Sequence, residues 1–148
     1  MKTSSMSGIS ESSLIACDVG LKRIGLAHVI GGIVLPLTPI LRKNRNQAAR
    51  DLSVLLAHRG ATHLIIGLPS GGVAEHEEMR RRIEHFISLL DFGGERVYVN
   101  EDYSSLEALE RVGHLGREER AKAQKDGRLD SLSACVILER YLTNLGES

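Results

Sequence analysis

Three carboxylates stand at positions in the sequence where a catalytic metal site could form. Asp18 interrupts an apolar run, Glu101 follows a second apolar run, and Asp130 precedes a third. A charge inside an apolar run is costly to bury unless it is paired or binds a cation. Oxygen ligands without histidine or cysteine suit Mg²⁺ or Mn²⁺. Two such ions ~3.5–4 Å apart stabilise the attacking and leaving oxygens of a phosphoryl displacement, so the chemistry indicated is metal-dependent phosphodiester hydrolysis.

Each of these acids also has a purely structural interpretation. Asp18 could be a buried acid that pairs with Lys22 or Arg23, and Glu101 could be a solvated turn residue. Asp130 could be only the N-cap of the helix that follows it, because aspartate is favoured there. Lys22 and Arg23 could be no more than a hairpin-turn pair. We favour ligand roles for the three acids, and phosphate contact for the two basic residues because they follow Asp18 so closely.

Short apolar strands and amphipathic helices must position these side chains. Apolar runs bounded by glycine or proline predict strands at 14–19, 24–30, 33–35, 63–69 and 96–100. Apolar residues at helical spacing predict helices at 48–59, 75–90, 104–115 and 130–142. The pair Gly31 and Gly32 predicts a tight hairpin with positive φ at both turn residues.

The order of these elements predicts an α/β fold with a mixed five-stranded sheet flanked by helices. Right-handed crossovers would place the fourth strand beside the first and the fifth strand beyond it. Active sites in such sheets lie at the carboxyl ends of the strands, where Asp18 and Glu101 are expected. Strands one and five would then be about 10 Å apart, at ~4.8 Å per step, so the two carboxylates could share a metal cluster. Asp130 could complete the set from the start of the last helix.

Composition limits the class of protein. The chain has 148 residues, 42% of them hydrophobic, which suffices for one domain with a real core but not for two. We expect a disordered leader at 1–13 and a single domain at 14–145. Lys+Arg and Asp+Glu are both 19, so any nucleic-acid binding must be local. Aromatic residues are only 3%, which counts against a protein that stacks bases on aromatic side chains.

Cysteine usage and hydropathy indicate a cytoplasmic protein without a membrane partner. Cys17 and Cys135 are far apart in apolar contexts, which predicts buried, reduced thiols. No apolar run approaches the ~18 residues of a membrane span, and the N-terminus lacks a secretory h-region. The basic run 80–82 follows acidic residues at helical spacing. We interpret it as a solvated helix face with Glu77–Arg81 and Glu78–Arg82 pairs.

Four segments together resemble the YqgF family: 17–27, 66–69, 100–105 and 128–142. Members are described as Holliday-junction-resolvase-like proteins, or as nucleases that mature the 5′ end of the small-subunit ribosomal RNA precursor. The resemblance runs from about residue 14 to 142, and the motifs occur in the family's order and spacing. It implies a ribonuclease H-like fold and a magnesium-dependent acidic triad, carried here by Asp18, Glu101 and Asp130.

The resemblance also implies a nucleic-acid partner, either precursor ribosomal RNA or branched DNA, bound by a monomer or a homodimer. Candidate substrate contacts are Lys22, Arg23, Ser104 and Ser105. The family's usual Asp-Glu-Arg after the fifth strand reads Asn-Glu-Asp at residues 100–102. This departure loses an arginine that could grip the substrate, and it offers a further acid as an alternative ligand.

Two other classes of function remain. A catalytically inactive protein could keep the fold and bind nucleic acid in ribosomal RNA maturation or transcription, and the departure at 100–102 favours that class. The turn after Asp18 also resembles the first phosphate loop of actin-like ATPases. Those enzymes need a second domain to enclose the nucleotide, which 148 residues cannot supply. Mg²⁺-dependent cleavage would separate the nuclease from the inactive binding protein.

Overall fold

The computed structural model describes residues 13–69, 74–100 and 128–147. The predicted leader, apart from Ser13, lies outside the described residues. So do the predicted helix 104–115 and the site residues Glu101, Ser104 and Ser105. The elements in chain order are β1 (Leu14–Val19), β2 (Arg23–Ile30), β3 (Ile33–Leu41), α1 (Arg45–His58), β4 (His63–Leu68), α2 (Ala74–Ser88), β5 (Glu95–Asn100) and α5 (Arg128–Glu147). No helix within the described ranges is long and apolar enough to span a membrane.

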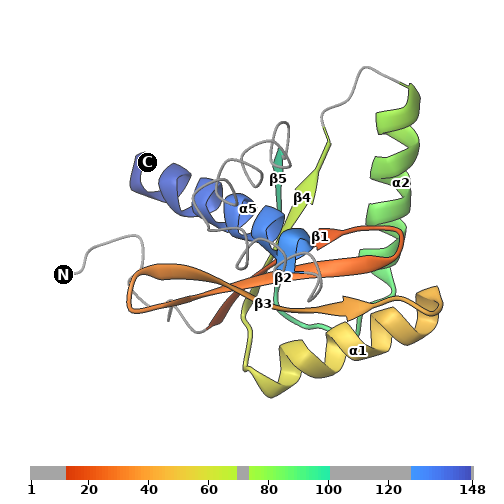
Figure 1. The fold of residues 1–148 in the computed structure, drawn as a ribbon, viewed down its shortest axis with the longest axis horizontal. Helices are drawn as coiled ribbons and strands as arrows, with labels where there is room; N and C mark the ends of the chain where they lie inside the picture. The colour runs from red at the N-terminus through yellow and green to blue at the C-terminus, as the bar shows by residue number, and fades with distance from the viewer. Residues whose placement is uncertain (1–12, 70–73, 101–127, 148) are drawn as a thin grey trace, which may run out of the picture.

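The five strands form one mixed sheet in the order β3-β2-β1-β4-β5, as predicted. Strands β1, β2 and β3 are antiparallel neighbours, whereas β4 lies parallel to β1 and β5 lies parallel to β4. Helix α5 crosses one face of the sheet, and α1 and α2 lie on the other (Figure 1). Because β1, β4 and β5 are parallel, their carboxyl ends lie side by side along one edge of the sheet, the edge formed by strand ends.

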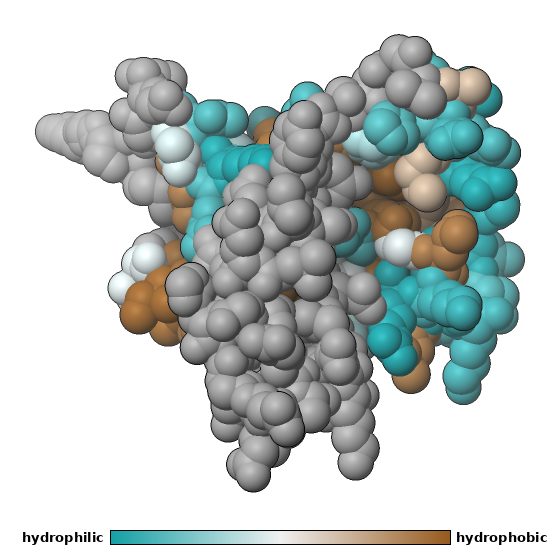
Figure 2. Space-filling view, turned by 45° about the horizontal axis from the view of Figure 1, so that its top comes forward, coloured by the Kyte–Doolittle hydropathy of each residue, from teal (hydrophilic) through white to brown (hydrophobic). Residues whose placement is uncertain are grey.

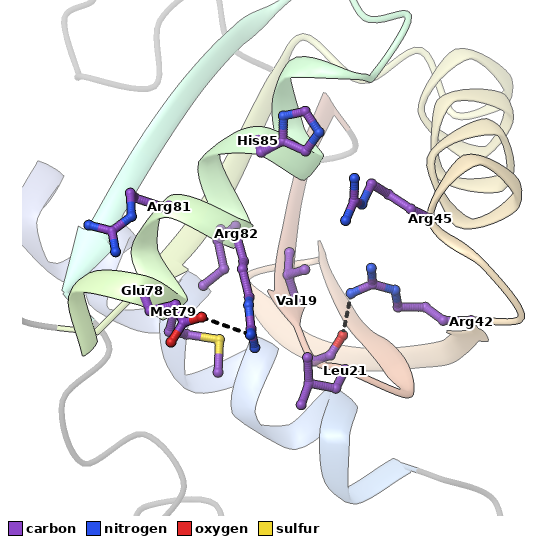
Figure 3. A pocket seen from close by; sticks show the side chains of 11 residues that line it. Val19, Leu21, Arg42, Arg45, Glu78, Met79, Arg81, Arg82 and His85 are labelled. Atoms are coloured by element: carbon purple, nitrogen blue, oxygen red, sulfur yellow. Dashed lines mark hydrogen bonds and ion pairs between the residues drawn. The ribbon is translucent and has the colours of Figure 1, made fainter. Parts of the chain in front are cut away.

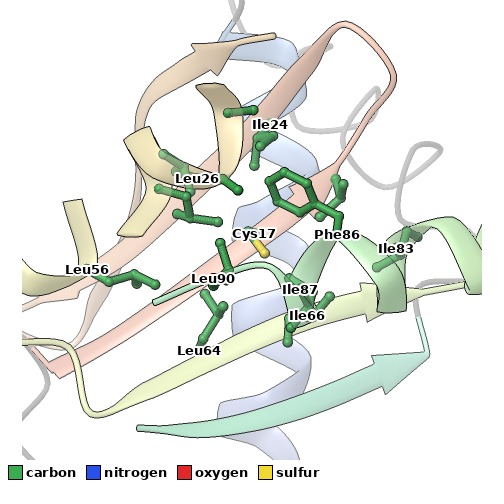
Figure 4. Close-up of a cluster of buried hydrophobic side chains, with 14 of the residues drawn as sticks. Cys17, Ile24, Leu26, Leu56, Leu64, Ile66, Ile83, Phe86, Ile87 and Leu90 are labelled. Atoms are coloured by element: carbon green, nitrogen blue, oxygen red, sulfur yellow. The ribbon is translucent and has the colours of Figure 1, made fainter. Parts of the chain in front are cut away.

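Alternation along β1 divides the core into two clusters. Ile15, Cys17 and Val19 point into the cluster under α1 and α2, together with Phe86 and other buried side chains (Figure 4). Leu14 and Ala16 point to the opposite face. There they pack with Ala27, Val29, Ile65, Val99, Ala134, Cys135, Ile137 and Leu138. Cys17 and Cys135 are both buried free thiols, as predicted.

The prediction for β3 was wrong in length. The strand was expected at 33–35 but extends to Leu41 and includes Pro36 and Pro39. Proline is tolerated because β3 is an edge strand, where a missing N–H need not interrupt a ladder on the outer side. A register shift between the pairs of Ile24 and Leu26 also gives β3 an extra residue at this point.

The turns and helix ends follow local chemistry. Gly31 and Gly32 have φ of 59° and 82°, which confirms the predicted hairpin turn. Helix α1 begins with a capping box that we did not predict. The Gln47 N–H donates to Asn44 Oδ1 at 2.7 Å, and the Asn44 N–H donates to Gln47 Oε1 at 3.3 Å. Helix α5 begins at Arg128 rather than near Asp130, so Asp130 lies within its first turn.

Candidate active site

Asp18 lies next to the carboxyl end of β1, on the face that α5 covers. Alternate side chains of a strand point to the same face, so Asp18 points to the face of Leu14 and Ala16, which belong to the α5-side cluster. Cys17 points to the opposite face. The residue is half-buried, whereas its neighbours on β1 are buried. Asp18 is therefore a partly exposed acid within an otherwise buried strand.

Glycine occupies both sheet positions beside Asp18. In β2 the partner of Asp18 is Gly25. In β4, Cys17 pairs with Ile66, and one further step in the same parallel register places Gly67 beside Asp18. Both glycines are buried. Neither of these two strand positions therefore carries a side chain beside Asp18 on the α5 face. The sequence contains a signal for this arrangement, because each of the two apolar strands has an isolated glycine. Such a glycine often marks a site where a ligand or another backbone approaches closely.

Ser131 attaches the start of α5 to the sheet close to Gly25, the strand partner of Asp18. Its hydroxyl is fully buried, accepts a hydrogen bond from the Leu26 N–H at 3.2 Å and donates to the Leu37 carbonyl oxygen at 2.5 Å. The hydroxyl thus bridges β2 and β3, next to the residue that pairs with Asp18. Since Asp130 directly precedes Ser131, this contact brings the first turn of α5 to the edge that carries Asp18.

The β1–β2 turn projects from the same edge and exposes two cations. The Gly20 N–H donates to the Arg23 carbonyl oxygen at 2.9 Å. A Cβ on Gly20 would lie 2.6 Å from that oxygen, so only glycine allows so tight a turn. Lys22 on the turn and Arg23 at the first position of β2 are both exposed. Together with Lys43 they line a hollow of about 710 Å³.

The sequence profile of the RuvX family, described as Holliday junction resolvase, matches residues 12–144. The chain belongs to the RuvX family. This confirms the resemblance to the YqgF family, which is the same family. A "Putative pre-16S rRNA nuclease" of Helicobacter hepaticus is 58% identical over 129 residues, which cover 87% of this chain and 94% of the relative.

Other RuvX-family relatives carry the same name. One from Helicobacter pylori (strain Shi470) is 58% identical over 86% of this chain and 93% of its own length. Another, from Sulfurovum sp. (strain NBC37-1), is 49% identical over 88% of this chain and 98% of its own length. Among solved structures, the fowlpox virus Holliday junction resolvase superposes with a TM-score of 0.51 and 12% identity, covering 91% of this chain and 99% of that one. The fold of this RuvX-family chain is therefore ribonuclease H-like, as predicted.

Only some of the predicted site residues of this RuvX-family chain lie within the residues that the structure describes. Asp18 and the backbone of Asp130 lie at the same edge, and β5 ends at Asn100, two strands from β1. Glu101 and the side chain of Asp130 are outside the described part. Within the described residues, no three His, Cys, Asp or Glu side chains are grouped to hold a metal ion. The triad therefore stays a prediction.

Replacing Ser131 with alanine is expected to lower the free energy of unfolding by about 1–3 kcal/mol, because the Leu26 N–H and the Leu37 carbonyl would lose a buried hydrogen-bond partner. Urea unfolding measures the change. Ser133→Ala is the matched control, since Ser133 is a buried serine two residues along the same helix. Equal unfolding midpoints for Ser131→Ala and the wild type would show that the hydroxyl does not hold α5 in place.

Proposed function

We propose that this protein is a metal-dependent nuclease that hydrolyses phosphodiester bonds, and that it processes the 5′ end of pre-16S ribosomal RNA. The observation that carries the proposal is the half-buried Asp18 at the strand ends, with a glycine on each side. The names of relatives at 49–58% identity support the substrate. Such a substrate agrees with the cytoplasmic location expected from the sequence.

The donor chemistry fits Mg²⁺ or Mn²⁺. We propose that Asp18, Glu101 and Asp130 hold the metal, because all three offer only carboxylate oxygens. Because Gly25 and Gly67 have no side chains, neither would hinder an ion or a phosphate next to Asp18. When bound, the metal would supply positive charge to the attacking and leaving oxygens of an in-line displacement.

The chain's own residues would bind and orient the substrate. Lys22 and Arg23 lie three and four residues beyond the carboxyl end of β1, so they can contact phosphates that flank the scissile bond. Ser131 holds the first turn of α5 over the strand ends and thereby orients Asp130. Ser104 and Ser105 are proposed as further substrate contacts, on the strength of the family resemblance.

A second candidate substrate is branched DNA, because the family is described as Holliday junction resolvase. Resolution of a junction needs two symmetric cuts and hence a two-fold dimer, whereas trimming of an RNA end does not. The deciding experiment compares cleavage of a precursor rRNA leader with that of a four-way DNA junction, with Mg²⁺ and with EDTA. We expect Mg²⁺-dependent cleavage of the RNA. Cleavage of the junction alone would reassign the substrate, and binding without cleavage of either would identify an inactive binding protein.

Replacing Lys22 and Arg23 with alanine is expected to weaken binding similarly for RNAs of different sequence. Phosphate contacts release counterions, so the slope of log K against log salt should flatten by about 0.7 per lost contact to a single strand. Titrations at several salt concentrations measure the slope. Arg50→Ala with Arg59→Ala removes the same charge from α1 and its C-cap and should leave binding unchanged. An unaltered slope in the Lys22 and Arg23 variant would show that the pair is only part of the turn.

A further inference from the structure

A second hollow lies on the sheet face opposite Asp18, between the β1–β2 turn, the start of α1, and α2. Its volume is about 580 Å³, which falls within the usual range of ligand sites. Arg42 and Arg45 enter it from one side and Arg82 from the other (Figure 3). We call this hollow the arginine groove. Figure 2 shows that the flank carrying α2 is mainly hydrophilic and is hollowed over apolar side chains.

Arg42 is held in place before any ligand arrives. Its Nη1 donates to the Gly20 carbonyl oxygen at 2.6 Å, and its guanidinium lies 5.1 Å from the centre of the Phe86 ring. Burial lowers the pKa of Arg42 from its usual value, and the positive charge of Arg45 lowers it further. An arginine remains charged at neutral pH despite such shifts. The groove therefore contains cations that repel one another, and an anion bound between them would relieve this repulsion.

Arg45 stands at an unfavourable position for helix stability. It is the first residue of α1, whose first turn contains no acidic residue. The partial positive charge at a helix N-terminus favours acids there and disfavours cations. A residue that opposes the local preference is expected where it serves a function. Here the exposed Arg45 side chain lines the groove.

The basic run of α2 is only partly the solvated helix face predicted from the sequence. Arg82 pairs with Glu78 at 2.9 Å as predicted, but Glu77 contacts Arg80 at 3.7 Å instead of Arg81. Arg82 and Glu78 remain more than half exposed, so this pair contributes little to stability. Among the described residues that line the groove, Glu78 is the single acid, whereas four are arginines. Its net charge therefore favours an anion.

The arginine groove continues towards the candidate active site. It shares Gly20, Leu21 and Arg42 with the neighbouring hollow that Lys22 and Arg23 line. The two hollows together form a cationic track around the β1–β2 turn, which directly follows the end of the strand that carries Asp18. Within the part of the chain that the structure describes, no Phe, Tyr or Trp lines the groove, so the track suits a phosphate backbone better than stacked bases.

We propose that the arginine groove binds the phosphodiester backbone of a single strand that continues from the scissile bond, on the face of the sheet opposite Asp18. This inference rests on the proposed nuclease function and adds the path of the substrate. A strand that leaves Asp18 would cross Lys22 and Arg23 on the turn and reach Arg42, Arg45 and Arg82. The contacts are to phosphates, so they favour long strands over short ones without selecting a sequence.

The test is binding of labelled single-stranded RNA in EDTA, so that no cleavage is needed. Arg45→Gln with Arg82→Gln should lower the salt slope by about 1.4, from about 0.7 for each of two lost contacts. If both proteins bind equally at about 1 M salt, affinity at about 0.1 M then falls about 25-fold. The wild type should gain affinity as the strand lengthens from about 4 to about 16 nucleotides, and the variant should lose most of that gain.

Arg50→Gln with Arg59→Gln is the charge-matched control, and thermal unfolding of both variants checks that they are folded. Equal salt slopes for the wild type and the groove variant would overturn the inference, even if the wild type cleaves RNA. Weaker binding by the groove variant would support the inference, even if the wild type fails to cleave and the proposed nuclease function is lost. Equally tight, groove-dependent binding of poly-glutamate would assign the groove to an acidic protein and overturn the inference.

Discussion

Replacing Asp18 with asparagine is expected to lower the rate of metal-dependent cleavage by more than about 100-fold, since losing even an outer partner of a metal ligand typically costs 10–100-fold. The amide keeps the shape of the carboxylate but removes its negative charge. The substitution leaves Gly25 and Gly67 unchanged, so the strand positions beside residue 18 stay without side chains. Single-turnover cleavage of the precursor RNA leader at saturating protein measures the chemical step without the contribution of binding.

The control for Asp18→Asn is the thermal unfolding midpoint with and without Mg²⁺. A metal that binds the folded protein raises this midpoint by mass action. We therefore expect Mg²⁺ to stabilise the wild type and to leave the variant unaffected, while both unfold at similar temperatures in EDTA. An unchanged cleavage rate in the variant would remove Asp18 from the mechanism.

The second large effect is expected after β5, where Glu101→Gln should eliminate cleavage and Asp102→Arg should preserve or raise it. Val97 and Val99 pack against the α5-side cluster. If the alternation of β5 continues by one more pair, Glu101 points to the same side as Asp18 and Asp102 points away. Removing the charge of Asp102 also relieves repulsion of an anionic substrate, by ~1–4 kcal/mol at ~4 Å depending on the effective dielectric.

Cleavage rates and Mg²⁺ affinities of the two variants are measured side by side. Glu101→Asp is a useful comparison because it keeps the ligand charge and changes only its reach. Loss of Mg²⁺ binding in Asp102→Arg, together with activity in Glu101→Gln, would make Asp102 the ligand and reverse the assignment. Such a result would also mean that the alternation of β5 is broken directly after Asn100.

Much of the fold could be predicted because its signals are local. Gly31 and Gly32 tolerate positive φ, so they mark the hairpin without reference to any distant residue. Apolar runs bounded by turn residues located all five strands, and the right-handedness of crossovers was enough to order them. Asp18 could be identified as a candidate from its place as a lone acid within an apolar run, and the family resemblance then added to this signal.

The environment of Asp18 required the tertiary structure. Gly67 is 49 positions away in the chain, and only the parallel register of β1 and β4 places it beside the carboxylate. The register follows from burial of whole strand faces, so no short segment encodes it. The same reason explains why Pro36 and Pro39 misled the prediction of β3. Their tolerance depends on β3 being at the edge, which is a property of the assembled sheet.

Ser131 and the arginine groove depend on packing in the same way. In the sequence, Ser131 is one polar residue at the start of an apolar helix, and its role appears only when α5 lies over the register shift between β2 and β3. Arg82 appears in the sequence as part of a solvated run. Packing of α2 against the sheet brings Arg82 opposite Arg42, which directly follows β3, and Arg45, which begins α1. Local pattern was enough to locate each described strand and helix, though not the full length of β3, whereas long-range packing decides which side chains share a site.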